Sequence, residues 1–222
     1  MSEWDILVLD KSGSMNSNKN DLIDGFNNLV SEQKKENSTN KFTVISFNET
    51  VEVIKDDTFP NVSFIESKDL ILKGTTALYD AIGYAYDLIL KNTDYTNINL
   101  TVITDGIENS SKIYTKYTLN DLKNSINEKF TFKMIFIGTD SSCLIDDEIN
   151  LHATQSIECS GSIQKALKIA SRTMSSTRDG SQYIPEGIVE TNPVTPLVLK
   201  RSFSSSDEKP PIIKKCKTYC NF

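Results

Sequence analysis

The stretch WDILVLDKSGSM, residues 4–15, decides how the rest of the sequence is interpreted. Four consecutive apolar residues, Ile6–Leu9, lead directly into Asp10. Two hydroxyl side chains, Ser12 and Ser14, follow at alternate positions with a glycine between them. A carboxylate at the end of a buried strand is costly unless a cation or another group neutralises it. The stretch therefore predicts a buried strand that delivers a carboxylate and two hydroxyls to one site.

Short apolar runs alternate with stretches of helical spacing over most of the chain. The apolar runs are nearly continuous, which is typical of strands in a parallel sheet covered on both faces. The predicted strands are Ile6–Leu9, Phe42–Phe47, Val51–Ile54, Leu100–Thr104, Phe132–Ile137 and Thr154–Cys159. We therefore expect one α/β domain over residues 3–176, with a doubly wound, mostly parallel sheet and helices on both faces in a Rossmann-like arrangement.

One predicted strand must run against the others. Only three residues, 48–50, separate Val51–Ile54 from Phe47. A connection this short allows a hairpin but leaves no room for a crossover helix, so we expect an antiparallel strand at the edge of the sheet.

Amphipathic stripes predict the helices between the strands. Thr118-x-x-Asp121 offers a weak capping box for the third stripe, and Ser160 or Ser162 is placed to cap the last one. A further short helix is expected between the fifth and sixth predicted strands. The four stripes begin at Leu22, Leu78, Leu119 and Ile163.

Composition excludes several classes of protein. The net charge of −6 argues against nucleic acid as a partner. No apolar run approaches the roughly 18 residues that a membrane span requires, and no secretory signal is recognisable at the N-terminus, so a cytoplasmic protein is expected. The Pro- and Ser-rich segment 177–222 predicts a disordered tail. Its Cys216 and Cys220 are expected to be thiols, because no second pair completes a zinc site.

Three loops with unusual chemistry follow predicted strands or precede predicted helices. They are Asp10–Ser14, Gly74–Ala77 and Thr104–Gly106. In an open parallel sheet, ligands bind outside the carboxyl ends of the strands. These loops offer carboxylates and hydroxyls without histidine or cysteine, and such oxygen ligands suit a hard divalent cation such as Mg²⁺.

Asp10-x-Ser12-x-Ser14, Thr76 in GTTALYDAI and Asp105 in ITDG resemble the metal-ion-dependent adhesion site of von Willebrand factor type A domains. The resemblance covers roughly residues 3–176. It implies Mg²⁺ or Mn²⁺ contacted by the two serines and the threonine, with both aspartates bonded directly or through water. It also implies a non-enzymatic protein that binds a partner, whose Asp or Glu carboxylate fills the open position on the metal. Thr75 is a second choice for the threonine ligand.

Two other interpretations of Asp10 stay open from the sequence. Asp10 and the serines are also compatible with a turn and an N-cap before the first helix. A strand that ends in Asp-x-x-Gly also resembles the nucleophile loop of haloacid dehalogenase-like phosphotransferases, in which the aspartate attacks phosphorus with help from Mg²⁺. That family usually carries a second aspartate where this chain has Ser12. It also needs two acidic residues beside the metal that come late in the sequence, and Asp146-Asp147 is the candidate for this pair.

His152 is the only histidine of the sequence. No second histidine or cysteine lies at a spacing from it that is typical of metal ligands.

Overall fold

The computed structural model describes residues 3–36, 38–139, 153–159 and 162–179. The predicted helix between the fifth and sixth strands, Asp146-Asp147, His152, and residues 180–222 of the predicted tail with its cysteines lie outside these residues. The predicted tail boundary at residue 177 was wrong, because the last helix continues to Asp179.

A six-stranded sheet forms the centre of the domain, in the order β3-β2-β1-β4-β5-β6. Only β3 is antiparallel to its neighbour, and all other adjacent pairs are parallel. This confirms the doubly wound fold and the antiparallel edge strand. The strands are β1 (Glu3–Asp10), β2 (Lys41–Phe47), β3 (Val51–Thr58), β4 (Asn97–Thr104), β5 (Thr131–Gly138) and β6 (Gln155–Glu158).

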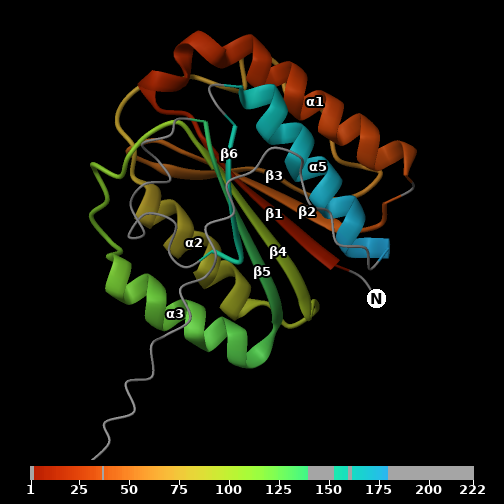
Figure 1. The fold of residues 1–222 in the computed structure, drawn as a ribbon, viewed down its shortest axis with the longest axis vertical. Helices are drawn as coiled ribbons and strands as arrows, with labels where there is room; N and C mark the ends of the chain where they lie inside the picture. The colour runs from red at the N-terminus through yellow and green to blue at the C-terminus, as the bar shows by residue number, and fades with distance from the viewer. Residues whose placement is uncertain (1–2, 37, 140–152, 160–161, 180–222) are drawn as a thin grey trace, which may run out of the picture.

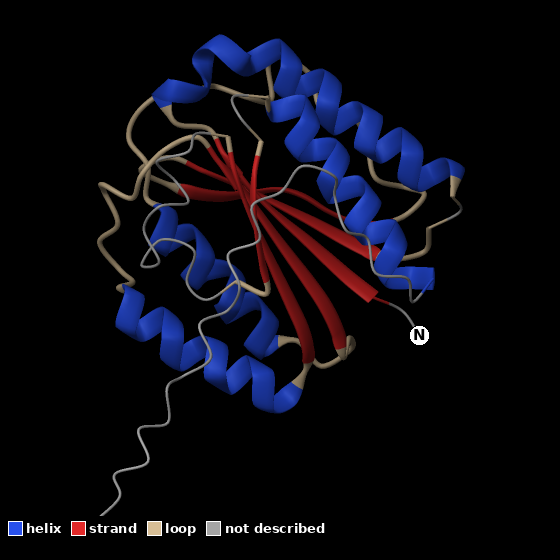
Figure 2. Ribbon diagram, in the orientation of Figure 1, coloured by secondary structure: helices blue, strands red, loops and turns tan. Residues whose placement is uncertain are grey.

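Helices cover both faces of this sheet. One face carries α1 and α5 side by side, and the other carries α2 and α3 (Figure 1). The layers of helix, strand and helix stand out when the ribbon is coloured by secondary structure (Figure 2). The helices are α1 (Lys19–Lys35), α2 (Leu78–Lys91), α3 (Lys116–Lys129) and α5 (Ile163–Asp179), and a 3-10 turn, η1 (Gly13–Asn18), precedes α1.

The alternation of side chains along β1 builds two separate hydrophobic cores. Leu7 and Leu9 pack into the core under α1 and α5. Ile6 and Val8 point to the opposite face and pack under α2 and α3. Because both faces are covered, the strand has to be apolar at consecutive positions, as the sequence pattern indicated.

The order of the strands reverses between β1 and β4. From β1 the chain moves outward to β2 and β3, and it later returns to the other side of β1 through β4. Leu9 of β1 stands beside Ile103 of β4. The carboxyl ends of these two strands, Asp10 and Thr104, therefore meet at the switch point where open α/β sheets bind ligands.

One helix start differs from the prediction and another agrees with it. The cap of α3 is Thr115, whose side chain accepts the backbone N–H of Thr118, so the predicted box starting at Thr118 was wrong. The first turn of α3 is exposed and carries no apolar stripe, which hid the true start. The last helix is capped by Ser162, as one of the two alternatives predicted: its hydroxyl accepts the N–H of Lys165 at 3.3 Å.

No helix among the described residues has the length and apolar character that crossing a membrane would need.

Candidate metal-binding site

Asp10 ends β1 with a fully buried side chain. One carboxylate oxygen accepts the backbone N–H of Ser12 at 2.7 Å. The other accepts the hydroxyl of Thr104 at 2.5 Å. Both contacts fix the orientation of the carboxylate, and neither brings a compensating positive charge.

Ser12 and Ser14 extend this arrangement from β1 toward β4. Their two hydroxyl oxygens lie 2.9 Å apart. The Ser14 hydroxyl donates to Oδ1 of Asp105 at 2.6 Å. Ser12 precedes the 3-10 turn as its cap residue, but its side chain makes no capping hydrogen bond. Asn18 before α1 makes none either. The serines are thus directed toward a common cluster, and the capping interpretation of this stretch does not describe their contacts.

Thr76 approaches the same cluster from the loop before α2. Its side chain is nearly buried. A methyl group placed on Gly106 would lie 2.9 Å from the Thr76 hydroxyl oxygen and 3.7 Å from Oδ2 of Asp10. The threonine hydroxyl and the aspartate carboxylate therefore border the same small space beside Gly106. Thr75 is exposed, and its backbone N–H points to Glu49 at 3.1 Å.

Backbone hydrogen bonds fasten the three loops to one another. The N–H of Gly13 donates to the carbonyl of Gly74 at 3.0 Å. A side chain on Gly13 would come within 3.3 Å of that carbonyl, so glycine here permits the close approach of two loops. The N–H of Thr76 donates to the side chain of Asn109, and the N–H of Asn109 donates to the carbonyl of Thr76, both at 3.0 Å.

Acidic side chains that sequence reasoning missed hold the loop after β4 against α2. Glu108 accepts backbone N–H groups from Ser111 at 2.7 Å and from Tyr79 in the first turn of α2 at 2.9 Å. Asp80 accepts the N–H groups of three consecutive residues, 112–114, each at 2.9 Å. These carboxylates fix the loop that carries Asp105 and Gly106. Apart from the local contact of Ser111, these contacts could not be inferred from short-range spacing, because their N–H donors lie about thirty residues from the carboxylate that accepts them.

Burial, together with the nearby negative charge of Asp105, raises the pKa of Asp10 from 3.8 to about 6. The hydrogen bonds from Thr104 and Ser12 oppose this rise without cancelling it. The cation that is nearest in sequence, Lys11, pairs instead with Glu52 at 2.8 Å. The site is therefore short of positive charge, which a bound cation would supply.

The donor set fits a hard divalent cation. The side chains that converge offer oxygen atoms alone, in the form of two carboxylates and three hydroxyls: Asp10, Ser12, Ser14, Thr76 and Asp105. Mg²⁺ takes six oxygen ligands and usually retains several waters among them. Within the described parts of the chain, no group of three or more His, Cys, Asp or Glu side chains could hold a metal ion. A metal at this edge of the sheet would thus be held largely by neutral hydroxyls.

Comparison with known proteins gives one family. Residues 6–108 match the family model described as von Willebrand factor type A domain. This matched segment contains all five converging residues. No curated protein sequence matches the chain.

Solved structures with a similar fold include proximal thread matrix protein 1 from the mussel byssus with a zinc-occupied MIDAS (metal-ion-dependent adhesion site) motif. That match has 17% identity and a TM-score of 0.55, and it covers 78% of this chain and 47% of the mussel protein. The vWF domain of the type V pili tip protein Mfa5 from Porphyromonas gingivalis matches at 10% identity with a TM-score of 0.55, covering 83% of this chain and 97% of that one.

A von Willebrand factor type A protein from Catenulispora acidiphila matches at 16% identity with a TM-score of 0.51, covering 78% of this chain and 43% of that one. This chain thus spans less than half the length of the mussel and Catenulispora proteins. At these identities the similarity establishes the fold.

Proposed function

This chain contains a von Willebrand factor type A domain, and we propose that it binds a partner protein through a divalent metal ion at the carboxyl edge of its sheet. The proposed ligands are Asp10, Ser12, Ser14, Thr76 and Asp105, and the proposed ion is Mg²⁺ or Mn²⁺. An acidic side chain of the partner would complete the coordination of the metal.

One observation carries this proposal. The hydroxyls of Ser12 and Ser14 link β1 to Asp105 after β4 through contacts of 2.9 and 2.6 Å. Turn formation and helix capping account for neither contact, because the Ser12 side chain makes no capping hydrogen bond. Ser14 and Asp105 are more than 90 positions apart in the sequence, yet their side-chain oxygen atoms lie next to each other. Coordination of one metal ion by both residues requires such an arrangement.

The chemistry of the ligands favours binding. Hydroxyls are neutral, so a metal held mainly by them keeps much of its positive charge. It then attracts a further carboxylate, which is the group that a partner protein can present. The zinc-occupied motif named for the mussel protein supports a metal at this type of site.

The phosphotransferase alternative gains no support from the geometry. A nucleophilic aspartate needs an oxygen that can approach phosphorus. Asp10 is fully buried, and each of its carboxylate oxygens already accepts a hydrogen bond. Ser12, at the position where that family usually carries its second aspartate, is engaged with Ser14. We therefore infer a binding protein without enzymatic activity.

Calorimetric titration of the full chain with Mg²⁺ and with Mn²⁺ tests the proposed site. Ser14→Ala removes the hydroxyl that bridges Ser12 and Asp105, and it should weaken metal binding at least about tenfold, or about 1.4 kcal/mol. Ser17→Ala is the matched control, since Ser17 is an exposed serine of the same 3-10 turn. Equal affinities of the two variants and the wild type would refute the assignment of the ligands.

A carboxylate probe tests the open position separately. Acetate added to the Mn²⁺-loaded protein should displace a metal-bound water and lower the water-proton relaxation rate. Unchanged relaxation at saturating acetate would contradict the role of a partner's acidic side chain while leaving the metal site intact.

A further inference from the structure

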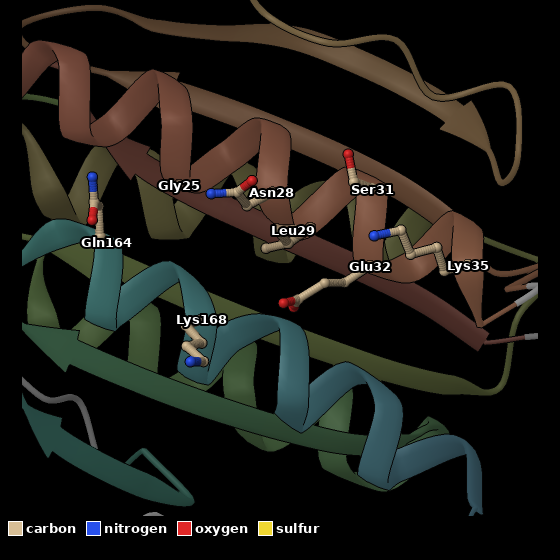
Figure 3. A pocket seen from close by; sticks show the side chains of 8 residues that line it. All are labelled: Gly25, Asn28, Leu29, Ser31, Glu32, Lys35, Gln164 and Lys168. Atoms are coloured by element: carbon tan, nitrogen blue, oxygen red, sulfur yellow. The ribbon is translucent and has the colours of Figure 1, made fainter.

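Two clefts formed by described residues lie away from the proposed metal site. One, of about 320 Å³, runs between α1 and α5 (Figure 3). Glu32 of α1 and Lys168 of α5 line it together with Lys35. These charges are mixed and the lining is polar, so this cleft indicates no class of ligand.

The second cleft lies at the opposite end of the sheet from Asp10. It measures about 420 Å³ and is bordered by the sheet on one side and by α2 with the loop that follows it on the other. Trp4 and Lys41, which lie at the amino ends of β1 and β2, place it at the amino edge of the parallel strands. We call it the Trp4 pocket, and it is lined by Trp4, Lys41, Thr43, Val53 and Asp56 of the sheet, by Tyr84, Leu88 and Lys91 of α2, and by residues 92–95 of the following loop.

A closed set of contacts forms the floor of the Trp4 pocket. The Trp4 indole N–H donates to the Thr43 hydroxyl at 2.8 Å, and that hydroxyl donates to Asp56 at 2.6 Å. Asp56 pairs with Lys41 at 2.9 Å. The Lys41 ammonium lies 5.8 Å from the centre of the Trp4 ring, which closes the set of contacts. The floor is thus held in shape before any ligand binds.

The walls of the pocket combine apolar side chains that are partly open to solvent with the polar residues 91–94. Val53 is 36% exposed and Tyr84 is 38% exposed, and Tyr95 packs against Trp4 with ring centres 5.9 Å apart. A hollow with a prearranged floor and partly exposed apolar side chains in its walls is suited to receive a short segment that is apolar at its centre and polar at its end.

We propose that residues 196–201 of this same chain, Pro-Leu-Val-Leu-Lys-Arg, occupy the Trp4 pocket. The path of the chain supports this occupant. The end of α5 lies beside the end of α1, where Ser175 donates to Glu36, shortly before β2 begins at Lys41. The chain therefore leaves α5 after Asp179 at the same edge of the sheet as the pocket. Forty-three residues follow Asp179.

The distance is within reach of this segment. Leu197 lies eighteen residues after Asp179. An extended chain of this length spans up to about 60 Å at about 3.3 Å per residue. A domain of this size has a radius of gyration of about 16 Å. The segment can therefore pass around the edge of the sheet from the face of α5 to the face of α2.

The composition of the segment matches the pocket. Leu197, Val198 and Leu199 form the longest uninterrupted aliphatic run of residues 180–222, and Lys200 and Arg201 follow at once. Two carboxylates and two lysines line the pocket. Lys41 pairs with Asp56 at 2.9 Å and Lys91 lies 3.8 Å from Asp87 outside the lining, whereas Asp94 forms no salt bridge among the described residues. Aliphatic side chains would enter the hollow while one of the two cations faces Asp94.

Hydrogen exchange on the full chain tests this assignment. In the variant Leu197→Asp/Leu199→Asp, amides of residues 51–58 and 84–95 should exchange at least about fivefold faster than in the wild type. Ile212→Asp/Ile213→Asp is the matched control and should leave these amides unchanged. Trp4 is the only tryptophan, so acrylamide quenching of its fluorescence should rise in the first variant alone.

A substitution in the wall of the Trp4 pocket provides an independent test. Tyr84→Ala should release the amides of residues 196–201, whereas Tyr117→Ala, at an exposed tyrosine on α3, should not. Equal exchange and quenching in the wild type and in the Leu197→Asp/Leu199→Asp variant would overturn the proposal. Protection that rises with protein concentration would place the segment of a second copy in the pocket and would overturn the intramolecular assignment. The metal site lies at the other edge of the sheet, so the two proposals fail independently.

Discussion

Replacing Asp10 by asparagine is expected to stabilise the metal-free protein and to abolish its response to metal. The side chain is fully buried at the end of β1, where no salt bridge among the described residues reaches it. Asparagine has nearly the same shape and keeps a carbonyl oxygen that can accept the N–H of Ser12. It removes the negative charge, whose burial is the cost, together with one of the two oxygen acceptors.

The magnitude follows from the pKa of Asp10. Its rise from 3.8 to about 6 corresponds to about 3 kcal/mol at about 1.36 kcal/mol per pKa unit. Below about pH 4 both the folded and the unfolded state bind the proton, so no cost remains. Between about pH 4 and 6 the folded state binds the proton more tightly, so the free energy of unfolding falls as the pH rises. At pH 7 the full cost of the buried charge is present.

Asparagine should therefore recover a part of this cost, about 1–3 kcal/mol at pH 7. The recovery is incomplete because the amide nitrogen cannot accept the Thr104 hydroxyl, which must turn toward another acceptor. The carbonyl of Gly106 already lies 3.2 Å from that hydroxyl. Magnesium should raise the stability of the wild type and leave the variant unchanged.

Urea unfolding at pH 5 and pH 7, with EDTA and with Mg²⁺, measures both effects. In EDTA the advantage of the variant should be larger at pH 7 than at pH 5, since the wild type regains stability as Asp10 binds its proton. A variant that is less stable than the wild type in EDTA at pH 7 would refute the argument that the buried charge is uncompensated. Parallel stability curves over this pH range would refute it equally.

Three further substitutions test neighbouring parts of the account. Gly106→Ala places a methyl group 2.9 Å from the Thr76 hydroxyl, so calorimetry should show metal binding weakened about tenfold or more, and wild-type affinity would contradict the assigned location of the ion. Thr115→Ala removes the cap of α3 and should cost about 1 kcal/mol of unfolding free energy in urea, with metal binding unchanged. Gly83→Ala brings a methyl group within 2.3 Å of the Tyr114 ring and should cost about 1–3 kcal/mol, and an increase in thermal stability would show that the ring can move aside freely.

The sheet could be predicted from the sequence because its signal is local. Continuous apolar runs such as Ile6–Leu9 report burial on both faces, and the three residues after Phe47 permit only a hairpin. The boundaries extend further than the apolar runs, since Glu3 and Asp5 continue β1 as buried polar residues. Asp5 accepts hydrogen bonds from side chains of residues 40 and 99, which no periodicity in β1 could indicate.

The residues that hold the proposed metal ligands in place could not be predicted, because they act through contacts between residues far apart in the sequence. Thr104 donates to Asp10 because Leu9 and Ile103 are neighbours across two strands, and a register of that kind cannot be read from spacing. Glu108 falls in a loop without a motif, although it fixes the first turn of α2. The motif thus predicted which side chains would meet, and the long-range register determined which further residues hold them there.

Anomalous diffraction from crystals of the full chain grown with Mn²⁺ would test the central claim most directly. The account predicts one strong peak within about 2.5 Å of the hydroxyl oxygens of Ser12 and Ser14 and beside Thr76. The peak should be absent from crystals of the Asp10→Asn variant grown in the same way. A wild-type map without a peak at this edge of the sheet, or with its main peak on another surface, would contradict the account.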